Sequence, residues 1–102
     1  TLNERIKFAV NEIGDASKPG IQDIINRIGA DGGSVSPEDF TDKTLELAGP
    51  ITVEADTHAA LLGYATSVGS LDFSTDEARE EAIPHIIHML QMIAATREFQ
   101  FA

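Results

Sequence analysis

The chain has 102 residues, no cysteine and a formal net charge of −10 at pH 7. This length suits one domain with a single core, and the cysteine count excludes disulfides, thiolate metal sites and cysteine nucleophiles. The strong negative charge opposes binding to nucleic acids and to anionic membrane surfaces. The chain also contains no apolar run near the roughly 20 residues that span a bilayer. Because it begins with Thr1, we expect a processed chain or a piece of a longer protein.

The first half of the chain shows helical spacing. Residues 1–14 predict a helix, since Thr1 and Glu4 match a capping box and Gly14 is a suitable stop. After a turn at residues 15–20, Pro19 suits the first position of a second helix, which Gly29 ends. Dense isoleucine also occurs in strands, but the spacing of three and four favours a helix. The isoleucines are Ile21, Ile24, Ile25 and Ile28.

Residues 29–36 are rich in glycine and serine and predict a loop. Ser36 and Pro37 then begin a third helix, which runs to about Ala48 and stops at Gly49 and Pro50. We expect this helix to bury Phe40, Leu45 and either Leu47 or Ala48.

A fourth helix is predicted from Thr52, as its cap, to Gly69, where glycine ends it. Its expected apolar face consists of Leu61, Leu62, Ala65 and Val68. The linker that follows, residues 70–74, is expected to tuck Leu71 and Phe73 into the core.

Residues 74–102 give the longest helical signal. Ser74 or Thr75 is the expected cap, and Glu77 stands where a capping box places its acid. Pro84 inside this pattern predicts a kink, or a break that leaves a short acidic turn before the main helix. One wide apolar stripe is predicted to be buried. It consists of Ile83, Ile86, Ile87, Leu90, Ile93 and Ala94.

These elements predict an all-α fold, a single domain spanning residues 1–102. It has about five helices, packed as a bundle or orthogonally, with a long kinked C-terminal helix. We expect no strands, because no alternating apolar run is bounded by hairpin turn signals.

His85 and His88 lie opposite the predicted apolar stripe, in line with Glu81 and Met92. We therefore expect them to face water, a partner or an ion rather than the core. Two imidazoles at this spacing are candidate ligands for a divalent metal, with Glu81 or His58 as a third. HxxH alone is a weak signal, so we predict no cofactor and keep the metal as the alternative.

Other catalytic patterns are weak. Most serines and threonines stand where helix capping explains them, and the chain has no GxSxG motif. The glycine-rich residues 31–34 lack the lysine of a phosphate loop. The carboxylates at Asp72 and Asp76 lack the remaining ligands of a calcium loop. A small enzyme with a site built from scattered residues stays open as a third hypothesis.

The C-terminal half resembles the closing segment of a large bacterial family. The similarity is carried by residues 44–50, by Leu61-Leu62-Gly63-Tyr64 and by residues 92–100, which include Glu98-Phe99-Gln100. The family is catalogued as domain of unknown function number eighteen hundred. The resemblance implies an exported or periplasmic origin and a helical module within a longer protein. It implies no catalytic residues.

We therefore predict a non-enzymatic helical interaction module, an accessory subunit that associates with a protein partner or with itself. The predicted partner-binding residues are His85, His88, Met92, Phe99 and Phe101. The apolar residues at the chain end either fold back onto the core or meet a partner. The alternative is a small metal- or cofactor-binding protein that uses His85 and His88.

Overall fold

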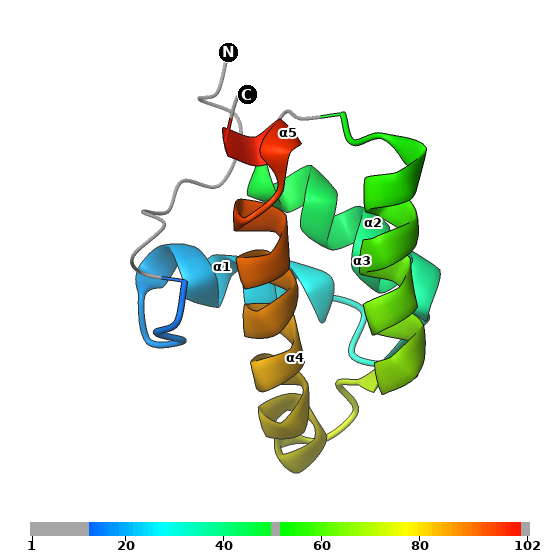
Figure 1. Cartoon of the computed structure of the whole chain (residues 1–102). Coiled ribbons are helices and arrows are strands. Elements are labelled where there is room, and N and C mark those ends of the chain that lie inside the picture. Colours follow the sequence, from blue (N-terminus) through cyan, green and yellow to red (C-terminus); the bar gives the residue numbers. More distant parts are fainter. Residues whose placement is uncertain (1–12, 50–51, 101–102) are drawn as a thin grey trace.

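A computed structural model describes residues 13–49 and 52–100, and the all-α prediction is confirmed (Figure 1). The elements in chain order are α1 (Pro19–Ile28), β1 (Ser34–Val35), α2 (Pro37–Ala48), α3 (Ala55–Val68), β2 (Leu71–Asp72), α4 (Asp76–Ala94) and α5 (Arg97–Gln100). In this part of the chain, no helix combines the length and apolar character needed to cross a bilayer. The first predicted helix falls on residues 1–12, outside the described residues, and Ile13 and Gly14 form a turn.

The core lies between α2 and the helices that pack on it, α1, α3 and α4, with α3 alongside α4 (Figure 1). All four isoleucines of α1 are buried, as their spacing predicted, and Phe40 of α2 is fully enclosed. From the stripe on α4, Ile86, Leu90 and Ile93 are buried, while Ile83, Ile87 and Ala94 are half-buried against the core. Met89 is also completely buried, so the apolar face of α4 is wider than predicted.

The predicted starts of three helices are confirmed. Pro19 is the first residue of α1. Ser36 caps α2 by accepting a hydrogen bond from the Asp39 backbone N–H at 3.2 Å. Of the two caps considered for α4, Thr75 is the one used, and its hydroxyl accepts from the Ala78 N–H at 3.0 Å.

The expectation of no strands was wrong. Ser34 pairs with Asp72 and Val35 with Leu71, in a two-stranded antiparallel ladder. Each strand has two residues, which is too short to show the alternation by which strands are recognised in a sequence. The ladder holds the 70–74 linker against the fold, and Leu71 and Phe73 are buried as predicted.

The C-terminal helical signal is two helices rather than one. The helix α4 continues through Pro84, which is exposed, so of the two outcomes expected there, a kink or a break, the break into a separate acidic turn does not occur. The chain then turns at Thr96, whose hydroxyl donates to the Ile93 carbonyl at 2.6 Å and accepts from the Phe99 N–H at 3.2 Å. This capping geometry competes with helix continuation, which is why α5 begins anew at Arg97.

Two further details differ from the predicted pattern. In α2, Ala48 is buried, as one of the two alternatives predicted, but Leu45 is half-buried, and Thr41 and Thr44 are fully buried. The two hydroxyls donate to the carbonyls one turn earlier, at 2.9 and 2.6 Å, which removes the cost of burying them. The helix α3 is preceded by Glu54 as N-cap, not Thr52, and the Glu54 side chain makes no capping hydrogen bond.

Candidate functional site

The helix α3 packs on α2 and α4, and two of its residues are buried in the core. Its buried residues are Leu61 and Ala65, and Tyr64 and Val68 are partly buried against the core. Ala59, Ala60 and Gly63 are exposed. A helix with few large side chains on its inner face leaves space beside it, because its neighbours have little to pack against.

That space is an open groove between the first turns of α3 and the junction of α4 with α5. We call it the α3–α4 groove. Its volume is about 490 Å³, within the range of about 300–1,000 Å³ common for binding sites. The groove is lined by Asp56, Thr57, Ala60, Leu61, Met92, Ala95, Thr96, Arg97 and Glu98.

The floor of the groove is apolar. Leu61 belongs to the core, and Met92 is half-buried against it. Ala60 and Ala95 are exposed small residues on the two walls. A thioether beside two alanines makes an adaptable apolar surface, since methionine is flexible and polarizable.

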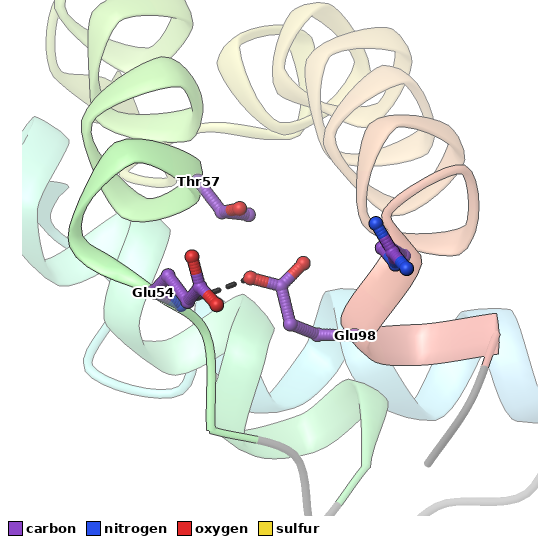
Figure 2. Close-up of a pocket in the computed structure, with 4 residues that line it drawn as sticks. Glu54, Thr57 and Glu98 are labelled. Carbon is purple, nitrogen blue, oxygen red and sulfur yellow. Dashed lines mark hydrogen bonds between the residues drawn. The ribbon is translucent and has the colours of Figure 1, made fainter.

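One end of the groove is polar and adjoins a second hollow lined by Glu54, Thr57, Arg97 and Glu98. Figure 2 shows the Glu98 side chain reaching from α5 across to the start of α3. Its carboxylate accepts a hydrogen bond from the Glu54 backbone N–H at 2.9 Å (Figure 2). The cap that α3 lacks from its own side chains is therefore supplied by a carboxylate 44 residues further along the chain.

This position holds the pKa of the Glu98 carboxyl below its usual value. The main cause is the hydrogen bond from the Glu54 N–H, followed by the N–H of Glu98 itself and the Thr57 side chain. The positive charge of Arg97 contributes in the same direction. Glu98 is therefore an ionised structural cap, and proton transfer, which needs a poised pKa, is a poor role for it.

Further along the seam between α3 and α4, the two histidines gather around Tyr64. The Tyr64 hydroxyl lies 3.2 Å from Nδ1 of His85. The His88 ring lies over the same tyrosine, with ring centroids 4.5 Å apart and tilted by 40°. Burial raises the pKa of Tyr64. His85 is half-buried and also borders a smaller cavity of about 240 Å³ with Glu81 and Asp72.

The structure divides the line of Glu81, His85, His88 and Met92 between two places, with Met92 apart from the other three. Neither His85 nor His88 belongs to the core, as predicted, but their neighbour is Tyr64 of α3. Met92 instead lines the α3–α4 groove. Phe99 is half-buried and packs against the core.

Two other candidate residues lie elsewhere. Phe101 falls outside the described residues. His58 is 2.9 Å from Oδ1 of Asp42, where it joins α3 to α2 and lies apart from the other histidines.

The described part of the chain brings together no group of three His, Cys, Asp or Glu side chains suited to one metal ion. The two imidazoles near Tyr64 would have to be completed by water or by a ligand from elsewhere.

Sequence reasoning missed Tyr64, Ala60 and Glu98. Tyr64 was noticed only as part of a resemblance, and Glu98 only as part of Glu98-Phe99-Gln100. No signal in the sequence pointed to Glu98, because Thr52 offered a local cap for the same helix. Only the structure shows that α3 follows Glu54 without a side-chain cap of its own and so needs an acceptor from another part of the fold. Comparison of the chain with protein-family models, curated proteins and solved structures found no match.

Proposed function

We propose that the chain is a non-enzymatic helical interaction module, an accessory subunit that docks a protein partner in the α3–α4 groove. The observation that carries this proposal is the open apolar floor between two helices. Met92, one of the predicted partner-binding residues, lines this groove, and Ala60 lines it from α3. Exposed apolar surface gathered in a hollow is typical of a binding site.

The chemistry of the groove also supports a binding role. The carboxylate of Glu98, whose pKa is lowered, is occupied in capping α3. The other polar side chains of the floor and rim are Asp56, Thr57, Thr96 and Arg97. Thr96 is likewise committed, since its hydroxyl shapes the α4–α5 turn. Such groups orient a bound surface and serve poorly as a nucleophile with an adjacent base.

A photo-crosslinking side chain at position 60 tests the proposal in extracts of the cells that make this protein. Position 59 is the matched control, because Ala59 is also exposed on α3 but does not line the groove. We expect one protein to be linked from position 60 and not from position 59. Identical products from both positions, or none from position 60, would contradict a docking role for this groove.

A second candidate, a metal-binding helical protein, is favoured by the gathering of His85 and His88 around one tyrosine. Imidazoles of this kind suit Zn²⁺. Calorimetric titration of the untagged protein with Zn²⁺ is the test. Binding of one equivalent of Zn²⁺ that is lost in His85→Ala and retained in His58→Ala would support this function. A heat no larger than that of Zn²⁺ added to buffer alone would contradict it.

A further inference from the structure

We infer that the occupant of the α3–α4 groove is a basic amphipathic helix, which seats an apolar side chain on Met92 and directs a Lys or Arg toward Asp56. This inference rests on the proposed docking function and names its partner class. It follows from the charge of the chain, the shape of the groove walls and the position of the acidic rim relative to the apolar floor.

Charge decides first between a second copy of this chain and a different partner. The chain carries a formal net charge of −10, so two copies repel each other on balance. Among the residues that the structure describes, the rim of the groove repeats this sign locally, with Asp56, Glu54 and Glu98 against one cation, Arg97. A basic partner relieves that repulsion and is steered toward the groove.

The walls decide the form of the partner. Both long walls are helices, and the exposed Ala60 and Ala95 face the groove from opposite sides. Small residues allow a third helix to approach the two backbones closely, as in helix-in-groove recognition. An extended peptide would instead seek a free sheet edge, and the described sheet consists of two strands of two residues each.

The order of groups along the groove fixes the pattern of the partner. The apolar floor around Met92 adjoins Asp56 and the hollow that contains Glu54. A bound helix therefore needs an apolar anchor and a basic residue on adjacent turns of the same face. Spacings of three or four residues satisfy this requirement.

Three synthetic peptides of about 14 residues are the probes, a length that gives roughly four helical turns. The first alternates Leu and Lys with helical spacing, the second has Ser in place of each Leu, and the third has Glu in place of each Lys. We expect the Leu/Lys peptide to bind at least about tenfold more tightly than either control, since both the anchor and the charge are needed. The chemical-shift changes that this peptide causes in the amide NMR spectrum of the protein should cluster around Ala60 and Met92.

Two pairs of variants locate the site. Ala60→Trp fills the groove and should weaken the Leu/Lys peptide by about tenfold or more, whereas Ala59→Trp should leave its affinity unchanged. Asp56→Asn should weaken it by about two- to fivefold, as expected for one exposed charge pair. Asp76→Asn, an equivalent first-turn change on α4, should have no effect. All four positions are exposed, so folding is preserved and is checked by thermal melting.

Several outcomes would overturn the inference. Equal affinity of the Ser/Lys peptide would mean attraction by charge alone, and equal affinity of the Leu/Glu peptide would mean that charge is not selected. Equal effects of Ala60→Trp and Ala59→Trp would place binding outside the groove. A concentration-dependent dimer that Ala60→Trp abolishes would assign the groove to a second copy. If crosslinking from position 60 captures a partner through an acidic or extended segment, this inference fails while the docking function stands.

Discussion

Truncating Leu61 tests how much the one large, fully buried side chain of α3 contributes to holding this groove wall on the core. Leu61 is 2% exposed, and the other buried residue of α3 is Ala65. Leu→Ala changes in cores cost about 2–5 kcal/mol, with the larger values where a closed cavity remains. Leu61 also lines the open groove, so water can enter the space, and we expect a loss of about 2–3 kcal/mol.

Leu62→Ala is the matched control. Leu62 is the next residue of the same helix and is half-buried, so both variants make the same change in helix propensity. We expect Leu62→Ala to cost less than about 1 kcal/mol, because less apolar surface returns to water on truncation. Urea unfolding followed by circular dichroism measures both free energies of unfolding. Native-state hydrogen exchange then reports whether α3 opens before α1 and α4 do.

The reasoning is refuted if the two variants differ by less than about 0.5 kcal/mol. It is also refuted if Leu61→Ala lowers amide protection equally in α1, α3 and α4, since α3 would then unfold only with the whole domain. In the expected case α3 loses protection selectively, and any ligand of the groove is lost with it.

Three other predictions concern the cap, a close packing contact and the tyrosine. Glu98→Gln should lower stability at neutral pH. The loss should vanish in acid. The pKa of the Glu98 carboxyl is lower in the fold than its usual value of 4.5, so the ionised carboxylate stabilises the fold fully above pH 4.5. This contribution disappears as the pH falls through the folded-state pKa. Gly29→Ala should cost about 1–3 kcal/mol in urea unfolding, since a Cβ there would lie 2.5 Å from the Phe73 ring. Tyr64, the only tyrosine, should ionise in an absorbance titration with a midpoint above 10.0.

Each of these has a clear contrary result. A stability difference for Glu98→Gln that persists unchanged into acid would mean that the carboxylate charge does not cap α3. Gly29→Ala as stable as the wild type would show that the Phe73 ring yields without cost. A tyrosine midpoint that is the same in native buffer and in urea would mean that the fold does not shield Tyr64.

Much of the fold was predictable because its signals are local. Pro19 and the four isoleucines after it define α1, and Ser36 with Pro37 defines the start of α2. In each case a cap or a periodicity acts within a few residues, so neighbouring letters carry the information. The periodic pattern gave a wrong prediction at Thr96. There, hydrogen bonds of the threonine side chain divide the single predicted helix into α4 and α5.

The sequence by itself determined that this is an acidic helical protein, where most of its helices begin, and that its histidine pair lies off the core. Only the tertiary structure decided how the groove is built. The cap of α3 joins Glu98 to Glu54 across 44 residues of the chain. Beside the groove, Tyr64 of α3 meets His85 of α4 across 21 residues. Helical periodicity repeats every 3.6 residues or so and says which face is apolar. It does not say which helix faces which, because that choice depends on how all the side chains fill the core together.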